Sequence, residues 1–283
     1  MPSVFKEAFL SLIMLMFYPE GAWLSELTSL DHMVEYNTIN LAQVGADPDV
    51  VINNTNWPLT PSQRTDTGLN LVLATYDTKP THVTNVEELE TNYNKLESVL
   101  RQHVETLRVK VTKSAAYNIS PDSNTANTPV LVTTGTNRGD GNLALTFADV
   151  LRLRTAFNKL NIPQENRILV LSVEHEEDLL REDMNRYNLL MTTRMLYGFK
   201  VYVSNINATY STSGVKNAAD SLGQSSSFAF YKPEVMRCMG DVKGEPESRW
   251  ADYRGWLLGM QLRFAAIPIR KKGIAAIYSG VAA

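Results

Sequence analysis

The sequence of 283 residues predicts an α+β fold. Three patterns predict it: a long amphipathic helix over residues 84–111, a strand-rich segment directly before that helix, and helices and strands that alternate after residue 126. Hydrophobic residues make up 44% of the chain and charged residues 20%, which is typical of a globular protein with a sizeable core. A chain of this length holds one large domain or two ordinary ones.

The charge and the cysteine content argue against several classes of protein. The formal net charge of −3 gives no sign of a nucleic-acid partner, because such partners usually require a basic surface. A single cysteine, Cys238, leaves no internal disulfide framework and fits synthesis in a reducing compartment. We interpret Cys238 as a small, partly buried apolar residue, because a nucleophilic cysteine needs a nearby histidine and none of the four histidines is close in sequence.

Residues 1–48 are predicted to form an N-terminal arm, with a short apolar helix followed by polar sequence of little periodicity. The apolar run at residues 9–17, FLSLIMLMF, also resembles the core of a signal peptide. Lys6 beside Glu7 and the sequence YPEG behind the run, where a small-residue cleavage site should be, favour a helix that packs on another surface. Nine residues are far fewer than the roughly 20 that cross a bilayer, and we expect no membrane contact.

Residues 49–83 are predicted to form an extended β-hairpin. Strand signals begin at residues 49–52 and resume at residues 69–76, and the segment between them carries prolines and a polar run. An isolated hairpin is marginally stable in water. These strands offer few residues that bury both faces, so we expect the hairpin and its tip, residues 58–68, to lie on a surface outside its own domain.

The helix over residues 84–111 is amphipathic along its whole length. Thr84 and Glu87 have the spacing of a capping box, and Glu97 and Arg101 are spaced for an ion pair on the charged face. At 1.5 Å per residue this helix would extend ~40 Å, while ordinary helices average about 11–12 residues. Its apolar face carries Leu89, Tyr93, Leu96, Leu100, His103, Leu107 and Val111, at steps of three and four residues.

Behind this helix, a Ser-, Asn- and Thr-rich stretch at residues 114–128 predicts a loop between two subdomains. Thr146, with Asp149 at the capping-box position, begins a helix whose apolar positions are Phe147, Val150, Leu151 and Phe157. The acidic first turn of a helix over residues 174–184 complements the positive end of the helix dipole. The other predicted elements are strands at residues 129–133, 167–173, 198–203 and 228–230, a turn at 137–142, a loop at 204–227, and strands within 249–264 and 267–278.

The sharpest candidate for chemistry is the acidic sequence around one histidine, EHEED at residues 174–178. Carboxylates beside an imidazole are the groups that a metal hydrolase uses to hold an ion and to activate water. The pattern lacks the second histidine, four residues on, that would place two ligands on one helical face. We interpret the sequence as a helix start, and we keep a metal-assisted hydrolase with Glu174, His175 and Asp178 as an alternative. We therefore predict no catalytic, cofactor-binding or metal-binding residues and no enzyme.

Other motifs are weaker. The Gly-rich residues 135–141 lack the Lys-Ser/Thr pair of a phosphate-binding loop. They contain Arg138-Gly139-Asp140, an integrin-type triplet. Together with the apolar N-terminus, this triplet keeps open another alternative, a secreted, adhesin-like surface protein that is cleaved near residues 21–25. The basic cluster of Arg270, Lys271 and Lys272 is interpreted as a solvated turn, and Trp250 and Trp256 as packing residues. Ser62, Ser172 and Ser279 have no Gly-x-Ser-x-Gly context.

The order of these elements resembles the major capsid proteins of tailed double-stranded DNA bacteriophages, which have the Hong Kong 97-type fold. In that family an N-terminal arm, an extended β-hairpin loop, a peripheral domain with a long spine helix, and an axial domain follow one another, and the chain then returns to the peripheral domain. The resemblance is carried by residues 145–150 (LTFADV), 160–167 (LNIPQENR), 168–173, 174–180, 198–205 (GFKVYVSN), 254–265 and 273–277.

The resemblance implies domain boundaries and a function. It implies an arm at residues 1–48, the hairpin loop at 49–83, the peripheral domain at 84–125, the axial domain at 126–225, and the peripheral return with closing strands at 226–283. It further implies self-assembly into homo-pentamers and homo-hexamers of an icosahedral head around double-stranded DNA, with scaffolding, portal and cement proteins as partners. The chain would be made in the host cytoplasm and located in the virion. A non-viral nanocompartment shell protein is a related alternative, and no cofactor is implied.

A shell subunit also fits the physical pattern. Such a protein covers area together with its neighbours, so segments that project from it bury their apolar surface on other copies. A standard interface buries ~1,600 Å², and closed symmetry sums several weak contacts of this kind. The sequence therefore predicts that the hairpin tip contacts an adjacent subunit and that packaged DNA is contacted without sequence preference.

Overall fold

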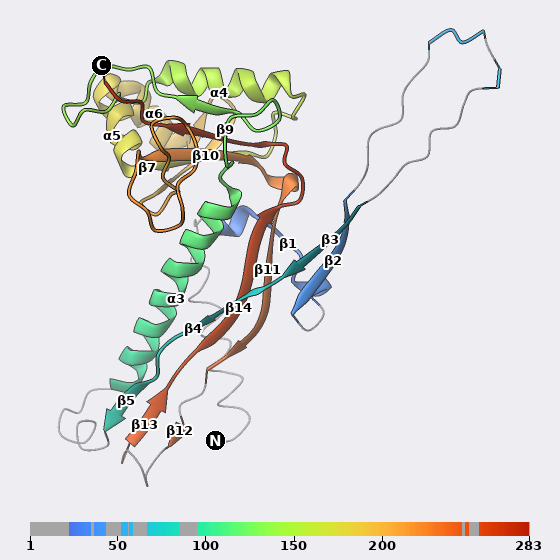
Figure 1. Cartoon of the computed structure of the whole chain (residues 1–283). Coiled ribbons are helices and arrows are strands. Elements are labelled where there is room, and N and C mark those ends of the chain that lie inside the picture. Colours follow the sequence, from blue (N-terminus) through green and yellow to red (C-terminus); the bar gives the residue numbers. More distant parts are fainter. Residues whose placement is uncertain are drawn as a thin grey trace.

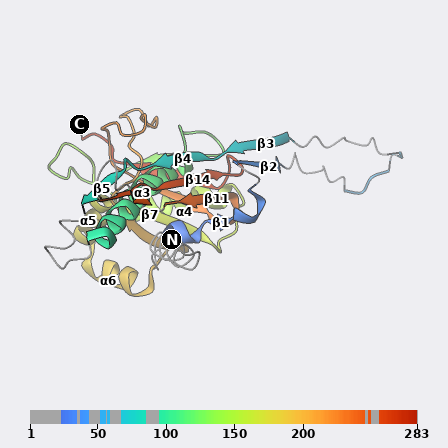
Figure 2. The same ribbon diagram turned by 90° about the horizontal axis from the view of Figure 1, so that it is seen from below.

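The computed structural model describes residues 23–34, 37–43, 52–55, 57–58, 67–84, 95–244, 247–248 and 255–282. In this part of the chain the long helix α3 (Lys95–Ile119) joins a layered unit of helices and sheet at one end to a set of long strands beside it. A two-stranded ribbon projects sideways from these strands, away from both units (Figure 1). The same ribbon extends from the molecule when it is viewed from below (Figure 2). None of the described helices combines the length and the apolar character that crossing a membrane requires.

A six-stranded mixed sheet forms the centre of the layered unit. Its strands in spatial order are β6 (Val130–Val132), β15 (Ile274–Tyr278), β10 (Ser226–Tyr231), β7 (Arg167–Ser172), β9 (Phe199–Ser204) and β8 (Met195–Leu196). β7 runs parallel to β9 and β15 parallel to β6, whereas β10 is antiparallel to both of its neighbours. The helices of the unit are α4 (Phe147–Lys159), α5 (Val173–Glu182) and α6 (Met184–Thr193).

The two faces of this sheet bury two different cores, because successive side chains of a strand point to opposite faces. On one face, Leu169 and Leu171 of β7 pack with apolar residues of α4, α5 and α6. On the other face, Ile168 and Val170 pack with the C-terminal half of α3 and with Trp23. The second core continues along α3 to the long strands, so the helix is buried against both units.

The long strands form a four-stranded sheet of order β1-β11-β14-β4. β11 (Val235–Lys243) and β14 (Gln261–Pro268) are antiparallel, with an irregularity in register between Met239 and Val242. A separate three-stranded sheet pairs β13 (Gly255–Leu258) with β12 (Glu247–Ser248) and β5 (Thr81–Thr84). The outer strands of the four-stranded sheet are β1 (Thr28–Ser29) and β4 (Ala74–Asp77).

Helix α3 confirms the predicted apolar stripe from Leu100 onward and extends it, while the predicted positions Leu89 and Tyr93 lie outside the described residues. Leu100, Leu107 and Val111 are buried, and His103 is 8% exposed. The helix does not end near residue 111 but continues to Ile119, because the buried Ala115 and Ile119 prolong the stripe at steps of four. The predicted loop at residues 114–128 was therefore wrong for its first six residues. Thr84 ends strand β5, and its proposed capping partner, Glu87, lies outside the described residues.

The hairpin begins earlier in the chain than the sequence predicted. β2 (Thr38–Gln43) pairs with β3 (Thr67–Val72) in a regular antiparallel register from Thr38↔Val72 to Gln43↔Thr67. Its first strand was placed at residues 49–52, of which Ile52 lies in a bend and the other three lie outside the described residues. The correct strand, TINLAQ, has alternating apolar positions, and fully buried Ile39 anchors the base of the ribbon in a small core with Leu73.

The segment before the hairpin, part of the predicted N-terminal arm, packs on its own chain in its described residues. Residues 23–34 pack on the body of the molecule: Trp23 lies edge-on to Phe228, with ring centroids 5.3 Å apart, and Leu24 and Leu27 are buried in the same core. β1 then runs parallel to β11. The apolar residues of this stretch are three or four positions apart, and the polar residues between them concealed the pattern. The short apolar helix predicted over residues 9–17 lies outside the described residues.

The closing part of the chain divides between two sheets. β10 and β15 belong to the six-stranded sheet, whereas β11 and β14 belong to the four-stranded sheet of long strands and β12 and β13 to the three-stranded sheet. β11 and α6 were not predicted, and the single strand expected over residues 249–264 is β13 and β14 in its described part. The strands β6, β7, β9 and β10 and the Thr146 capping box of α4 confirm their predictions.

Candidate functional site

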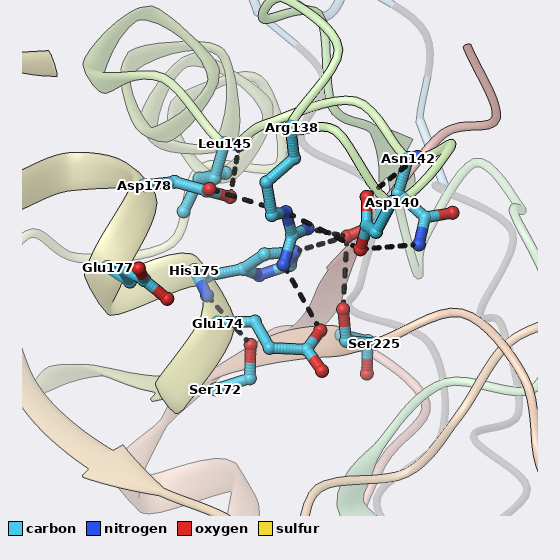
Figure 3. A network of polar contacts seen from close by, with 12 residues as sticks. Arg138, Asp140, Asn142, Leu145, Ser172, Glu174, His175, Glu177, Asp178 and Ser225 are labelled. Carbon is cyan, nitrogen blue, oxygen red and sulfur yellow. Dashed lines mark hydrogen bonds and ion pairs between the residues drawn. The ribbon is translucent and has the colours of Figure 1, made fainter. Parts of the chain in front are cut away.

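The three residues of the hydrolase alternative lie at the start of α5, where the sheet strand β7 ends. Ser172 caps this helix, and its hydroxyl accepts a hydrogen bond of 3.2 Å from the backbone N–H of His175. Helical periodicity then turns His175 and Asp178 inward and leaves Glu174 exposed. All three converge on one guanidinium group, that of Arg138, as Figure 3 shows.

His175 is enclosed between two serine hydroxyl groups. Its Nδ1 lies 2.7 Å from Oγ of Ser227 and its Nε2 lies 2.9 Å from Oγ of Ser279. Burial, and secondarily the nearby charge of Arg138, lowers the pKa of His175 to about 3, so the imidazole is neutral. A neutral imidazole has one donor and one acceptor nitrogen, and both are engaged here. His175 therefore has no lone pair free to bind a metal ion or to accept a proton from a substrate.

Arg138 links the loop before α4 to α5 and to the end of β15. Its Nη1 lies 3.3 Å from Oε2 of Glu174, its Nε lies 3.4 Å from Oδ1 of Asp178, and Nη2 donates a hydrogen bond of 2.9 Å to Ser279. Asp178 in turn accepts a hydrogen bond of 2.8 Å from the backbone N–H of Leu145. Burial raises the pKa of Asp178, while Leu145 and Arg138 act in the opposite direction.

This arrangement is a structural clamp. The predicted carboxylates are paired with a buried arginine, and the described residues contain no group of three or more His, Cys, Asp or Glu side chains that could hold a metal ion. The side chain of Arg138 is only 9% exposed, so the Arg-Gly-Asp triplet does not present its guanidinium to a receptor. Sequence reasoning missed the role of Arg138, because Glu174 and Ser279, which it links, lie 36 and 141 residues away along the chain.

Cys238 lies in β11, in the small core that anchors the ribbon. Burial raises the pKa of its thiol to about 12, and the charge of Asp31 acts in the same direction. The thiol is therefore neutral at physiological pH and lacks the thiolate character of a nucleophile. This agrees with its interpretation as a small apolar residue, although the side chain is fully rather than partly buried.

The remaining candidates have structural or surface roles. Arg270 donates hydrogen bonds of 2.9 and 2.5 Å to the carboxylate of Glu234, and Lys271 is 84% exposed at its side chain. Trp256 packs partly buried against the main core. Ser62 and Trp250 lie outside the described residues.

The surfaces that remain without a partner are the better candidate for function. The ribbon has no further strand on either edge in the described part of the chain. Large apolar side chains on and beyond it are exposed: Val72 by 61%, Trp57 by 76% and Ile52 by 80%. The unpaired backbone N–H and C=O groups of an exposed strand edge can pair with another chain. These residues define the ribbon surface, which extends away from the body (Figures 1 and 2).

Comparisons with known proteins identify the fold. No family model matches the sequence, and no curated protein matches it. Among solved structures, a chain from the capsid of Ralstonia phage GP4 is similar with a TM-score of 0.69 at 7% identity, over 91% of this chain and 88% of that chain. A chain from the capsid of the cyanophage P-SCSP1u has a TM-score of 0.65 at 15% identity, over 92% and 89%.

A virus-like particle from Pyrococcus furiosus is similar over 96% of this chain and 98% of that chain, with a TM-score of 0.61 at 11% identity. Each of these likenesses covers more than nine-tenths of this chain. The chain therefore has the α+β fold of Hong Kong 97-type capsid proteins, with the projecting hairpin and the long spine helix that characterise it.

Proposed function

We propose that this chain is the major capsid subunit of a tailed double-stranded DNA phage. Copies of it assemble into pentamers and hexamers of an icosahedral head that encloses the genome. The observation that carries the proposal is a fold shared with capsid chains over about nine-tenths of the sequence. In addition, no further strand among the described residues pairs with either edge of the ribbon.

The ribbon surface supports self-association on physical grounds. A two-stranded ribbon alone is marginally stable, and exposed Val72 and Trp57 would be covered by a neighbouring body in a shell. Full burial of one such apolar side chain contributes about 1.5–3 kcal/mol. Each contact is weak by itself, but closed symmetry repeats it around the particle, so the sum holds the shell together.

The sheets suggest which parts serve which role. In this proposal the six-stranded sheet with α4, α5 and α6 is the axial domain, and it includes β10 and β15. The peripheral domain consists of α3 with the strands β11 to β14. Residues 126–225 therefore form most, but not all, of the axial domain, and the hairpin loop starts at β2.

The wider setting follows from the same proposal. The capsid is built in the host cytoplasm and becomes part of the virion, where the inner wall contacts DNA without sequence preference. The net charge of −3 fits a shell whose inner surface tolerates DNA without binding it sequence-specifically. Scaffolding, portal and cement proteins are further partners of such a shell.

A size measurement on the purified full-length chain tests this function. We expect light scattering to report particles of very high mass, and negative-stain microscopy to show closed shells of uniform diameter. A chain that stays monomeric at all concentrations, both alone and with the proteins encoded beside it, contradicts the proposal. Shells that carry a cargo enzyme and no DNA would instead support the nanocompartment alternative.

A further inference from the structure

A cavity of about 460 Å³ lies between the C-terminal half of α3 and the loop that follows β9. The helix lines it with Lys110, Lys113 and Tyr117, and Tyr76 of β4 lies beside them. The rest of the wall comes from the loop, at residues 205–209 and 218–222. This is the part of α3 that approaches the layered unit in Figure 1. The volume falls within the ~300–1,000 Å³ that small-ligand sites occupy.

The loop that forms this wall is held in place by its own contacts. Oγ1 of Thr209 donates a hydrogen bond of 2.9 Å to the carbonyl of Ser221, which joins the two parts of the loop that line the cavity. An ion pair between Lys113 and Asp220 fixes the loop to the helix. Because the wall is formed in advance, a ligand does not have to order it on binding.

The charged side chains at the cavity are mostly cationic. Two lysines and one aspartate, Asp220, line it. Lys113, through its hydrogen bond and its charge, and Lys110, through its charge, lower the pKa of the Asp220 carboxyl, so both ammonium groups lie near this carboxyl. Lys110 is exposed and makes no hydrogen bond or ion pair within the described chain. The excess of positive charge favours an anionic ligand, because hydrogen bonds from an ammonium group to an anion are stronger than neutral ones.

An acceptor without a partner lies at the same cavity. The side-chain amide of Asn207 donates a hydrogen bond of 2.9 Å from Nδ2 to the carbonyl of Ser226, which fixes its orientation. Its other atom, Oδ1, is shielded from solvent and has no hydrogen-bond partner among the described residues. A buried acceptor that stays unpaired costs free energy, so such atoms are usually satisfied. A ligand with an N–H group would satisfy this one.

Aromatic side chains add a third kind of contact. Tyr76 and Tyr117 are each partly buried at the cavity. Aromatic rings stack with any nucleobase, because every base has a π-face. Lys110 and Tyr117 are seven residues apart on α3, so the cationic and aromatic parts of the wall are separated by ~10 Å along the helix. A nucleoside monophosphate likewise carries its base and its phosphate at opposite ends of one sugar.

We propose that this cavity binds a free nucleoside monophosphate whose base carries an N–H donor. The base lies against Tyr117 and donates a hydrogen bond to Oδ1 of Asn207. The phosphate accepts hydrogen bonds from the ammonium group of Lys110 and from Lys113, which bridges it to Asp220. This inference is independent of the proposed capsid function, because the whole site belongs to one subunit.

Lysine footprinting on the full-length wild-type chain tests the proposal without any substitution. The chain is acetylated with a water-soluble active ester, with and without AMP, and the rate at each lysine is read by peptide mass spectrometry. We expect AMP to slow acetylation of Lys110 several-fold and in a saturable way, and to leave Lys159, an exposed lysine of α4, unchanged. No slowing at Lys110, or equal slowing at both lysines, would overturn the proposal.

Two smaller compounds decide whether the whole nucleotide is recognised. Adenosine lacks the phosphate and ribose phosphate lacks the base, so each can make only part of the contacts. We expect neither to slow acetylation of Lys110 at the concentration at which AMP does. Protection by either compound that equals protection by AMP would show that the cavity does not bind a nucleotide as such, and the proposal would fail.

A variant then measures the contribution of the phosphate contact. Lys110→Met should weaken AMP binding about tenfold in calorimetry, because the ammonium donor is lost. Lys159→Met is the matched control and should bind AMP as the wild type does. Both lysines are exposed, so both variants should fold. An unchanged affinity in Lys110→Met would contradict the phosphate contact and the proposal with it.

Discussion

The ammonium group of Lys216 lies at the C-terminal end of α3. It donates hydrogen bonds to the carbonyl oxygens of Tyr117, at 3.0 Å, and Ser120, at 2.8 Å, and it lies 2.7 Å from Oδ1 of Asp122. The same group is 4.4 Å from the centroid of the Tyr117 ring. A cation is favoured at this end of a helix, where carbonyl groups lack partners. One side chain thus fixes the loop before β10 to the end of the long helix.

Replacing this lysine should destabilise the fold. In Lys216→Met the carbonyl groups and Asp122 lose a buried charged donor, and we expect the free energy of unfolding to fall by about 1–3 kcal/mol in urea titration. Lys271→Met is the matched control, because Lys271 faces the same Asp122 at 3.7 Å with a side chain that is 84% exposed. We expect it to change the free energy by no more than about 0.5 kcal/mol. Equal losses in both variants would contradict the role of Lys216.

The buried histidines predict how stability depends on pH. The pKa of His175 is lowered to about 3 in the folded chain, and burial also lowers the pKa of His103. Below pH ~6.5 the unfolded chain therefore binds protons that the folded chain does not, so stability is complete above this pH and falls as the pH drops toward 3. For each histidine we expect a slope of up to about 1.4 kcal/mol per pH unit, measured by chemical unfolding.

Variants separate this contribution from that of carboxyl groups. Glu26 has its pKa lowered to about 2, chiefly by hydrogen bonds from Lys200 and Tyr202, so its contribution is lost only between pH ~4.5 and 2. His175→Gln should flatten the profile between pH 6.5 and 4.5, because it removes the imidazole whose pKa burial lowers most clearly. A wild-type free energy that is constant from pH 7 to 5 would rule out a buried neutral histidine.

At the scale of elements, local sequence patterns correctly predicted the start of α4 and the strand β7, because neighbouring residues determine a helix cap and an apolar run marks a buried strand. The capping box of Thr146 and Asp149 is fully formed, with each side chain accepting from the other's backbone N–H, and Arg167 to Ser172 form the buried strand that their apolar run indicated. Pairing between distant strands could not be predicted in this way. β15 pairs with β6 although the paired residues lie 146 positions apart in the sequence, as in Val130 with Ala276 and Val132 with Tyr278.

The elements that the sequence concealed share a physical cause. β11 has an irregular register near Gly240, which breaks the alternation that marks a strand. The end of α3 carries serine and asparagine beside its buried Ala115, so its surface resembles a loop. The clamp of Arg138 depends on one partner in α5 and another just after β15, and a local sequence pattern cannot predict such a set.

The ribbon predicts a separation between folding and assembly. Val72→Ser removes an apolar side chain that is 61% exposed in the subunit, so the free energy of unfolding should change little. If the ribbon lies on a neighbour, the lost burial of ~1.5 kcal/mol per contact should raise the concentration needed for particle formation about tenfold. Light scattering against protein concentration measures this, and Asn70→Ser on the same strand is the control. Identical assembly curves would argue against a ribbon contact.

At the scale of the whole molecule, residues 23–34 hold the two units together. Trp23 packs on Phe228 and Phe230 of the six-stranded sheet, while β1 pairs with β11 of the long strands. The carboxylate of Glu26 adds ion pairs to Lys200, at 2.5 Å, and to Lys232, at 3.3 Å. Because these contacts reach both sheets within a few residues, the segment couples the stability of one unit to that of the other.

Removing the tryptophan should weaken both units at once. We expect Trp23→Ala to lower the free energy of unfolding by about 3–5 kcal/mol and to speed amide hydrogen exchange in β10 and in β11 together. Trp57→Ala, at a side chain that is 76% exposed, is the control and should leave exchange in both strands unchanged. Faster exchange in β10 alone would show that residues 23–34 do not couple the two sheets.

Leu73 gives the ribbon a mechanical consequence. This one buried residue separates β3, which pairs with β2, from β4, which pairs with β14. The chain therefore passes from the projecting ribbon into the main sheet without a flexible linker, and its N–H still bonds the carbonyl of Asn37, at 3.0 Å. A force applied at the far end of the ribbon acts as on a lever whose fulcrum is Leu73, and it is delivered directly to β14 and to the helix that lies on it.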